Sequence, residues 1–553
     1  MEIKKLFKEN VLLISIFILF IVTRFFNLNK YLWYNESAWA AEINLFNVFP
    51  YEHHYIPHMP GSLIFYKLFT SIFGLSTMSM RLVPIIFSIS IFFLIYQFAK
   101  KYFNKDIALL SCFVYTVSFY AFISSIQVDM DGAILSFFIS LTMFIFYDTS
   151  KIEKSFFPGM FVLGILLTII SCIREISGII ILFILFLYYV FDAIMNNKNI
   201  LNVINFFIQS GMVFLILFCS VLIYLYRNVP NLITKIFSFM TSINSEKSLI
   251  NIMLVIYALM FIGILLIPLF FTNYKKKKNL FFILWIGTFF VIFLGLINIG
   301  DIARYLMPII PAFCILFGIF MYDLQEKNYL SDNILISSFT IMFIVLFIGN
   351  MIMSFNPPNN ALMMLNKILL FDFNFKFLMT NSSMLPLYIS FYSILIVISI
   401  ICFCYILYLI SKKIQIKKTA INILLGCMFA YEIFLMYEFT TNLTQPNFSK
   451  IGFEMVDYYN NNLDENYFLN IDSPNYDPSL FYLNKNKSSI HILSPFNDFT
   501  TNDVYLKDFN LSSSYVFFMN YLNLPDEIIS LENCTILKTF SDKNMVLGYI
   551  YKC

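Results

Sequence analysis

Charged residues are scarce in this chain, where they make up 12% of 553 residues. Soluble domains carry about 25% charged residues, because polar side chains must cover a surface that faces water. Half of that share is too little to cover such a surface, which excludes a wholly soluble protein. A strong basic excess is also missing, since the net charge is only +3. The composition therefore suggests no nucleic-acid partner.

Glycine and cysteine are also in short supply. The chain has 16 glycines, less than half of the usual share of about 7%, although transporters with moving, broken helices rely on Gly and Pro. Seven of the nine cysteines lie in apolar runs and suit inert packing positions. Cys534 and Cys553 lie in the C-terminal segment and would meet if 534–540 and 546–552 formed a hairpin. A disulfide and two free thiols both remain open there.

Apolar residues, by contrast, fill 59% of the chain and come in long blocks. About 20 apolar residues in a helix match the thickness of the hydrocarbon core of a bilayer. Lysines precede the first block and no small-residue cleavage site follows it, so we interpret it as an uncleaved span. The sequence thus predicts a polytopic α-helical membrane protein. Its thirteen candidate spans are 11–28, 82–99, 106–125, 131–148, 156–173, 176–194, 203–226, 249–272, 279–299, 304–322, 333–354, 384–410 and 419–438.

The placement of lysines predicts the orientation of these spans. Lysine clusters occupy alternate loops on one side of the predicted bundle, and basic loops mark the cytoplasmic side. The N-terminus is then cytoplasmic, and an odd number of spans puts the C-terminal domain outside. Asn35-Glu36-Ser37 is formally a glycosylation acceptor on the outer side. A glycan there would obstruct the polar residues described below, which favours a prokaryotic plasma membrane.

The chain divides into a predicted membrane domain, 1–438, and a predicted external domain, 439–553. The first external loop, 29–81, contains two pieces with helical periodicity and an apolar face, 36–49 and 60–73, as helices that lie along a membrane surface do. The tail has short apolar runs between turn clusters, which predicts a small α/β domain. Its expected elements are helices at 451–462 and 525–532 and strands at 466–470, 489–493, 514–519, 534–540 and 546–552.

Ionisable residues gather at the outer ends of the predicted spans. A charge near membrane depth is costly, so each such group carries a functional hypothesis. All of them face outward near one level in the predicted topology, and we expect them to converge on one cavity. The clusters are Glu36 after the first span, Glu52-His53-His54 with His58, Asp129 and Asp131 before the fourth span, Arg174-Glu175 between the fifth and sixth, and Asp301 to Tyr305 at the tenth.

Each of these residues also has a purely structural interpretation, which stays open at this point. A carboxylate suits a solvated loop or a helix N-terminus, and an arginine suits lipid phosphates or a neighbouring acid. The structural interpretations are a solvated loop for Glu36 and Asp129, a helix N-terminus for Asp131, a membrane anchor for Arg81 and Arg304, mutual neutralisation for Arg174 and Glu175, and an interfacial position for the histidines.

The order of these clusters resembles the GT-C glycosyltransferases, in particular the protein O-mannosyltransferases and the bacterial lipid A aminoarabinose and galacturonic acid transferases. Motifs in the family's order, with a similar span number and an external tail, carry this resemblance over residues 10–325. The matching segments are Glu36-Ser37-Ala38-Trp39 (family Asp-Glu-Ala-aromatic), His58-Met59-Pro60 with Phe65-Tyr66 (His/Lys-Pro-Pro-aromatic), Phe73-Gly74 and Arg81-Leu82 (Phe-Gly and Arg-Leu), Asp131 to Phe138 (Pro-Asp-Ala-x-Leu-x-Phe-Phe) and Arg304 to Pro311 (Arg-Tyr-Leu-x-Pro-x-x-Pro).

The chain departs from the family pattern in the first loop. The family's Asp is Glu36 here, the adjacent acid is Ser37, and the first Pro of the Pro-Pro pair is Met59. Glutamate keeps the carboxylate with a longer reach, so the chemistry can survive. Loss of the second acid puts a metal role in doubt at this position, and a divalent ion near Glu36 and the histidines is left open.

The resemblance implies an inverting glycosyltransferase that takes its sugar from a polyprenyl-phosphate carrier. The leaving lipid phosphate gains negative charge, which a fixed arginine fork stabilises, and the acceptor hydroxyl needs a carboxylate to take its proton. The acceptor, whether a lipid, a glycan or a protein, stays open. The expected site residues are Glu36 as the catalytic base, Arg304, Tyr305, Arg174 and His58 at the donor phosphate, and Asp131 orienting a sugar hydroxyl or an arginine.

Other classes of membrane protein remain as alternatives. A multi-span transporter matches the number of spans, but the halves show no repeat and the acids gather at the outer rim. A polysaccharide polymerase or ligase usually has its large external loop late among the spans, whereas the charged, His-bearing loop here is the first. A non-catalytic membrane scaffold is the third alternative class. The discriminating observation is whether Glu36, Asp131 and Arg304 come together.

Overall fold

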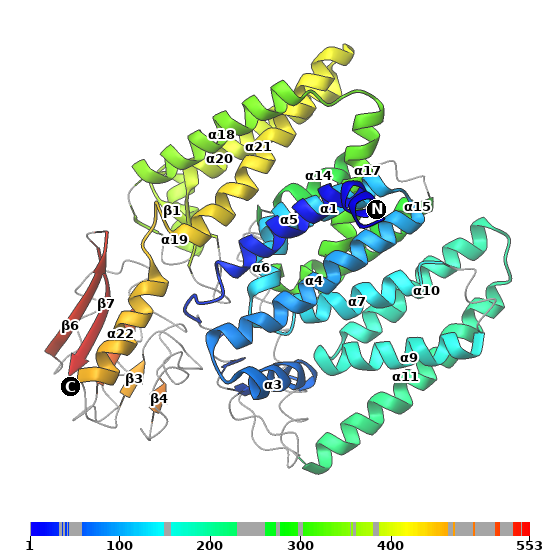
Figure 1. Cartoon of the computed structure of the whole chain (residues 1–553), viewed down its shortest axis with the longest axis horizontal. Coiled ribbons are helices and arrows are strands. Elements are labelled where there is room, and N and C mark those ends of the chain that lie inside the picture. The colour runs from blue at the N-terminus through cyan, green and yellow to red at the C-terminus, as the bar shows by residue number, and fades with distance from the viewer. Residues whose placement is uncertain are drawn as a thin grey trace.

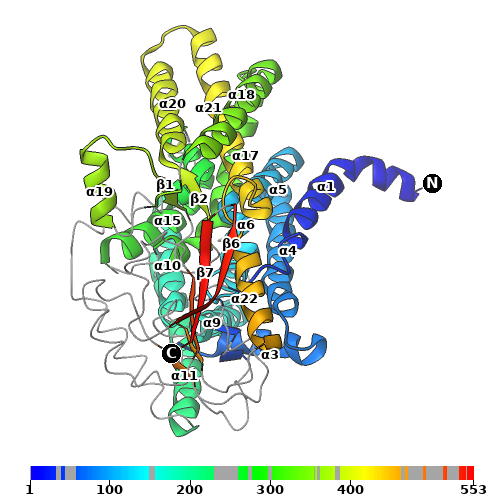
Figure 2. The ribbon, with the colours of Figure 1, turned by 90° about the vertical axis from the view of Figure 1, so that its left-hand side faces the viewer.

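The computed structural model is a bundle of helices with a small mixed sheet at one end (Figure 1). The N-terminal helix packs against α5 (Lys105–Val117) and α6 (Phe119–Ile126) and projects from the side of the bundle (Figure 2), and the C-terminus lies at the sheet. The residues that the structure describes are 2–32, 36, 39–40, 42–43, 58–148, 156–228, 260–271, 277–296, 302–353, 355–357, 361–379, 386–462, 468–470, 490–492, 515–519, 535–543 and 545–552.

Seven helices among the described residues are long and apolar enough to cross a bilayer. Each coincides with a span that the sequence predicts, because a long apolar run is a strong local signal. These helices are α4 (Thr77–Tyr102), α10 (Ser177–Met195), α11 (Ile200–Asn228), α17 (Ile310–Glu326) with the short η3 before it (Met307–Ile309), α18 (Asp332–Ile352), α20 (Phe391–Ile410) and α21 (Ile414–Thr441).

The other predicted spans are broken or shorter apolar helices. Helices α5 (Lys105–Val117) and α6 (Phe119–Ile126) form one span that bends by 69° at Ser118. All thirteen predicted spans coincide with helical segments, although 249–259 lies outside the described residues. The polytopic helical fold class is confirmed. The shorter helices are α1 (Glu2–Phe25), α7 (Ala133–Ile145), α9 (Phe156–Ile173), η1 (Gly263–Leu266) with α14 (Ile267–Phe271), and α15 (Lys277–Phe290) with the π-helical η2 (Val291–Leu296).

Helix α17 lies at the centre of the bundle, and most of its side chains are buried. Gly318 allows this position: a Cβ there would lie 2.2 Å from the hydroxyl of Ser111 on α5. In contrast, α18 and α20 keep many apolar side chains exposed, as helices that face lipid do. The short helix α16 (Ile302–Tyr305) and η3 lead into α17. The central position of α17 therefore holds α16 against the middle of the bundle.

Of the two surface helices predicted in the loop after α1, the second is present as α3 (Gly61–Phe73), and most of the first, 36–49, lies outside the described residues. One face of α3 is buried, and the other exposes Ile64, Leu68 and Ile72, which suits a helix at a membrane surface. Gly61 begins the helix where a Cβ would lie 2.4 Å from the carbonyl oxygen of Cys172. This close contact brings the start of α3 next to the turn between α9 and α10.

The tail contains a five-stranded mixed sheet of order β4-β3-β5-β7-β6. Strand β3 pairs in parallel with both β4 and β5, whereas β7 pairs antiparallel with β5 and β6. The predicted hairpin is β6–β7, but Cys534 and Cys553 lie outside the described residues, as does the predicted helix 525–532. The small α/β tail is confirmed. Its strands are β3 (Phe468–Asn470), β4 (Ile490–Ile492), β5 (Tyr515–Met519), β6 (Thr535–Asp542) and β7 (Met545–Lys552).

Helix α22 (Phe448–Asn462) connects the bundle to the tail sheet. On one side it packs on β7, where Gly548 lies against Met455. On the other side Phe453 packs edge-on against the ring of Tyr31 at 5.3 Å, and Ser449 Oγ accepts a hydrogen bond from the Tyr31 backbone N–H at 2.8 Å. Figure 2 shows α22 beside β6 and β7. The tail is therefore attached to the start of the first external loop.

A short hairpin completes the fold ahead of α20. Strands β1 (Lys376–Leu378) and β2 (Tyr388–Ser390) pair antiparallel after the helix α19 (Ala361–Leu369). The Lys376 ammonium donates to the carbonyl oxygen of Thr444 at 2.9 Å. This contact joins the hairpin to the segment that connects α21 with α22.

Candidate functional site

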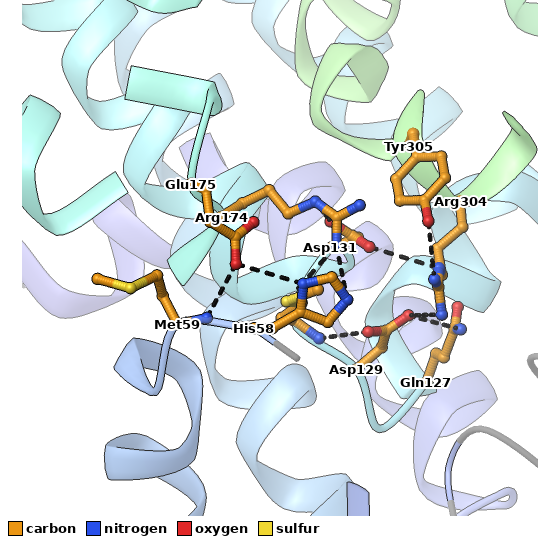
Figure 3. A network of polar contacts seen from close by, with 10 residues as sticks. His58, Met59, Gln127, Asp129, Asp131, Arg174, Glu175, Arg304 and Tyr305 are labelled. Atoms are coloured by element: carbon orange, nitrogen blue, oxygen red, sulfur yellow. Dashed lines mark hydrogen bonds and ion pairs between the residues drawn. The ribbon is translucent and has the colours of Figure 1, made fainter. Parts of the chain in front are cut away.

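A buried network of charged residues forms where four chain segments meet (Figure 3). The segments are the start of α3, the loop from α6 to α7, the turn from α9 to α10, and α16. The contacts include three ion pairs between arginine and aspartate. The network therefore brings together five of the six expected site residues, which are His58, Asp131, Arg174, Arg304 and Tyr305.

The loop from α6 to α7 is held in place by its backbone. Gly132 begins the turn into α7, where a Cβ would lie 3.0 Å from the Ser124 carbonyl oxygen. The Tyr66 hydroxyl of α3 donates to the Asp129 carbonyl oxygen and accepts from the Asp129 backbone N–H, both at 3.0 Å. These contacts hold the loop so that the carboxylates of Asp129 and Asp131 both face Arg304.

Two arginines share the two aspartates. Arg304 Nη1 lies 3.2 Å from Asp129 Oδ2, and Arg304 Nε lies 3.4 Å from Asp131 Oδ2. Arg174 Nε lies 3.4 Å from the other oxygen of Asp131, Oδ1. The aspartates are almost fully buried and the arginines nearly so. Charges this deeply buried are retained only when they are paired.

Tyr305 lies between the two guanidinium groups. The centre of the Arg174 guanidinium is 4.5 Å from the centroid of the Tyr305 ring, and that of Arg304 is 5.2 Å away. Arg304 Nη2 also donates to the Tyr305 hydroxyl at 3.2 Å. The ring itself stacks on Phe293 at 5.6 Å. The ring thus makes cation–π contacts with both guanidinium groups, which stabilise two positive charges close together.

His58 and Glu175 form the edge of the network on the α3 side. His58 Nδ1 lies 3.3 Å from Glu175 Oε1, which also accepts the Met59 backbone N–H at 2.9 Å. The other ring nitrogen, Nε2, lies 3.5 Å from Arg174 Nη1. A guanidinium has no acceptor, so the tautomer that fits both contacts is a neutral imidazole with its proton on Nδ1.

Burial shifts the pKa values of two groups in opposite directions. Burial lowers the pKa of His58; the nearby Glu175 opposes the shift and Arg174 adds to it. Burial raises the pKa of Asp131 to about 7, with Arg174 and Arg304 opposing the rise and Asp129 adding to it. Burial therefore favours the neutral form of the His58 imidazole and opposes ionisation of the Asp131 carboxyl, which the two arginines support.

We expect His58 to lower the thermal stability of the wild-type protein, relative to a His58→Gln variant, as the pH falls from 8 to 5.5. An unfolded histidine takes up a proton at about pH 6.5, whereas folded His58 resists protonation, so the folded state is penalised as the pH falls through that value. A His58→Gln variant should lose less over the same range. Thermal unfolding of both proteins in detergent at the two pH values measures the difference. Equal losses would contradict a neutral, buried His58.

Glu36 lies on the other side of the α6–α7 loop, paired with Arg81. Its Oε2 accepts from Arg81 Nη2 at 2.7 Å, and its Oε1 accepts from the Val128 backbone N–H at 3.1 Å. Both side chains are buried, and Arg81 also donates to the carbonyl oxygen of Ile126 at 2.9 Å. Glu36 thus reaches the network through the neighbour of Asp129, and none of its described contacts is with Arg304.

Several structural interpretations of the sequence are wrong. Glu36 and Asp129 are buried, not solvated, and Arg81 is buried inside the bundle, not exposed as a membrane anchor. Buried charges require partners, which here come from segments far apart in the sequence. Arg174 and Glu175, rather than simply neutralising each other, take Asp131 and His58 as ion-pair partners.

Three residues that hold the site have no functional role among the sequence-based predictions. These are Tyr66, Gln127 and Arg81; Gln127 Nε2 donates to Asp129 Oδ2 at 3.2 Å. One signal was present for Arg81, because a charge five positions inside an apolar helix needs a partner. No group of three His, Cys, Asp or Glu side chains in the described part of the chain is arranged to hold a metal ion. His53 and His54 lie outside that part.

Comparison with known proteins agrees with this architecture. The family model of the dolichyl-phosphate-mannose-protein mannosyltransferases matches residues 57–224. The crystal structure of ArnT from Cupriavidus metallidurans in the apo state is similar over 98% of this chain and 97% of that chain, with 12% identity and a TM-score of 0.62. The structure of the same ArnT bound to undecaprenyl phosphate is similar over the same shares, with 12% identity and a TM-score of 0.59. No curated protein sequence matches the chain.

These similarities cover the two parts of the chain differently. The family model covers the segment with α3, the α6–α7 loop and the α9–α10 turn, and the structural match extends over the tail as well. The resemblance to the GT-C glycosyltransferases is therefore confirmed, with an ArnT-like fold over nearly the whole chain.

Proposed function

We propose that this protein is an inverting glycosyltransferase that moves a sugar from a polyprenyl-phosphate donor to an acceptor on the outer face of the membrane. The observation that carries the proposal is the pair of arginines, Arg174 and Arg304, which both contact the Tyr305 ring beside two aspartates. Arg174 also lies in the segment 57–224, which matches the family model of the dolichyl-phosphate-mannose-protein mannosyltransferases.

The arginines suit the leaving group of such a reaction. A lipid phosphate gains negative charge as the bond to the sugar breaks, and a rigid guanidinium fork stabilises that charge. In the described structure the forks are balanced by Asp129 and Asp131. A phosphate would compete with these carboxylates for the guanidinium groups, and the carboxylates would then be free to accept sugar hydroxyls. His58, neutral and 3.5 Å from Arg174, would lie at the edge of the phosphate site.

The base in this proposal is Glu36. In the proposed step a bond forms between the acceptor oxygen and the anomeric carbon, and the bond from that carbon to the phosphate oxygen breaks. The acceptor proton passes to the Glu36 carboxylate, and the electron pair leaves with the lipid phosphate. Attack from the face opposite the leaving group inverts the anomeric centre. The role of Arg81, at 2.7 Å from Glu36, is to hold this carboxylate in its orientation.

The orientation of the protein is part of the same proposal. The lysine-rich loops support a cytoplasmic N-terminus, with the charged network and the tail on the outer side. The glycosylation acceptor Asn35-Glu36-Ser37 supports a prokaryotic plasma membrane, since a glycan there would obstruct the site. The tail domain, 439–553, would shape the access of a lipid, glycan or protein acceptor and would not perform chemistry. Its attachment through α22 to Tyr31, next to Glu36 and Arg81, supports this division.

The test is a comparison of glycans in cells with and without the gene. We expect one polyprenyl-phosphate sugar to accumulate when the gene is deleted, while one surface glycan loses that sugar. The purified protein should release lipid phosphate from the donor only when an acceptor is present. A transporter or a scaffold would release no lipid phosphate, and unchanged lipid-linked pools would contradict the proposal. A polymerase would instead consume an oligosaccharide carried on the lipid.

We expect a Gly452→Ala change in α22 to reduce acceptor use while donor binding persists. A Cβ at Gly452 would lie 2.8 Å from the ring of Tyr31, whose carbonyl oxygen accepts from Arg81 at 3.4 Å. A small displacement there should lower kcat roughly tenfold. The matched control is Gly287→Ala, where the added Cβ would meet no atom within 4 Å. Unaltered kcat in the Gly452 variant would show that α22 does not influence the site.

A further inference from the structure

Glu432 lies in the middle of α21 with its carboxylate fully buried. Its Oε2 accepts from the Phe119 backbone N–H at 2.6 Å, and its Oε1 accepts from the Ile264 backbone N–H at 2.7 Å. An acid at membrane depth is costly and calls for a specific role. Glu432 belongs to none of the described segments that form the charged network.

The two backbone N–H groups that donate to Glu432 lie at helix starts, where they have no hydrogen-bond partner within their own helix. The span α5–α6 bends by 69° at Ser118, and the first N–H groups of α6 have no partner inside that helix. The Ile264 N–H lies in the first turn of η1. Inside a membrane such broken backbone is stable only when another group satisfies it. Here the Glu432 carboxylate accepts a hydrogen bond from each of two such segments, the start of α6 and the start of η1.

Gly263 is shaped for this contact. Its φ of +55° is in the left-handed region that favours glycine. A Cβ at this position would lie 2.0 Å from Glu432 Oε1 and would force the carboxylate away. The position of the Glu432 carboxylate thus requires a residue without a side chain at position 263.

The segments held by Glu432 lead to the charged network. Helix α6 ends at Ile126 and continues directly into the loop that carries Asp129 and Asp131. Helix α6 also contacts η3, which follows Arg304 and Tyr305. Phe261, just before η1, packs edge-on against Tyr120 of α6 at 5.4 Å. A shift of the bend would therefore move the aspartates relative to the arginine.

We propose that Glu432 is a positioning residue for the reaction, which fixes the α5–α6 bend and so sets the place of Asp129 and Asp131 against Arg304. The inference rests on the proposed glycosyl transfer. It assigns Glu432 no contact with substrate and no proton transfer. Because misplacement of reacting groups by about 1 Å costs about 10²-fold in rate, loss of the carboxylate should lower kcat by roughly tenfold to a hundredfold.

The matched control is Asn422, ten residues earlier on the same helix. Asn422 is also fully buried and also holds a helix break, because it accepts the Ser331 N–H at 2.8 Å and donates to the Tyr329 carbonyl oxygen at 2.7 Å. That turn connects α17 and α18. Glu432→Ala and Asn422→Ala should lower the thermal midpoint similarly, but only Glu432→Ala should lower kcat.

A second variant separates positioning from general damage. Gly263→Ala should reproduce the kcat loss of Glu432→Ala, and the double variant should lose no more activity than Glu432→Ala alone. The activities are measured on full-length protein with a polyprenyl-phosphate sugar, at a temperature where every variant is folded. Wild-type kcat in Glu432→Ala, equal loss in Asn422→Ala, or additive losses in the double variant would overturn the inference. A wild-type protein without transfer would instead overturn the proposed function.

Discussion

An Arg304→Ala variant is expected to lose 10²–10³-fold in kcat, the usual effect of removing one group that stabilises developing charge, a range of about 2.7–4 kcal/mol. The guanidinium lies 3.2 Å from Asp129 and 3.4 Å from Asp131. Its removal takes away the charge proposed for the leaving phosphate, leaves Asp131 paired with Arg174, and removes the arginine partner of Asp129. Turnover of a polyprenyl-phosphate sugar by purified protein measures the effect.

Three further measurements make the Arg304 prediction specific. Arg304→Lys keeps the charge but loses the planar fork, so it should also lose activity, though less than alanine does. Polyprenyl phosphate should raise the thermal midpoint of the wild-type protein, and this rise should shrink in both variants. The control is Arg227→Ala, which removes an exposed arginine at the end of α11. Unchanged donor affinity and turnover in Arg304→Ala would place the phosphate elsewhere.

A Glu36→Gln variant is expected to lose 10²–10⁴-fold in kcat, which is the usual contribution of a general base. Glutamine has nearly the same shape but only one oxygen, so it can accept from one of the two donors, Arg81 at 2.7 Å or the Val128 N–H at 3.1 Å. The thermal midpoint should therefore fall, because Arg81 loses its charged partner, and the capacity to accept a proton disappears. Measurement of kcat together with expression and the thermal midpoint separates the two effects.

Two other acids serve as comparators for Glu36. Glu42→Gln changes a second buried acid of the same loop, and it should retain turnover. Asp131→Asn should lower turnover through the arginines that it contacts. Full activity in Glu36→Gln together with a dead Asp131→Asn would transfer the role of base to Asp131, whose pKa is raised to about 7. Full activity in both Glu36→Gln and Asp131→Asn would contradict the proposal that either carboxylate acts as the base.

The sequence by itself determined the elements and their order. Apolar runs of about 20 residues specify spans locally, because the bilayer selects for length and hydrophobicity. A second local signal predicted the hairpin of β6 and β7 in the tail, because turn residues separate two short apolar runs there. The topology also predicted that Glu36, Asp131, Arg174 and Arg304 would converge, since each lies at the outer end of its span. Asp131, Arg174 and Arg304 do meet, whereas Glu36 pairs with Arg81.

Only the tertiary structure decided which charges are partners. Glu36 pairs with Arg81, 45 positions away, and Asp131 with Arg174 and Arg304, because helix packing sets which side chains meet and no local pattern encodes that choice. The same holds for Glu432, whose partners Phe119 and Ile264 are exposed by helix breaks that an apolar run does not reveal. Because an unpaired buried charge is costly, the sequence indicates that such a charge has a partner. Which residue is the partner depends on how the helices pack.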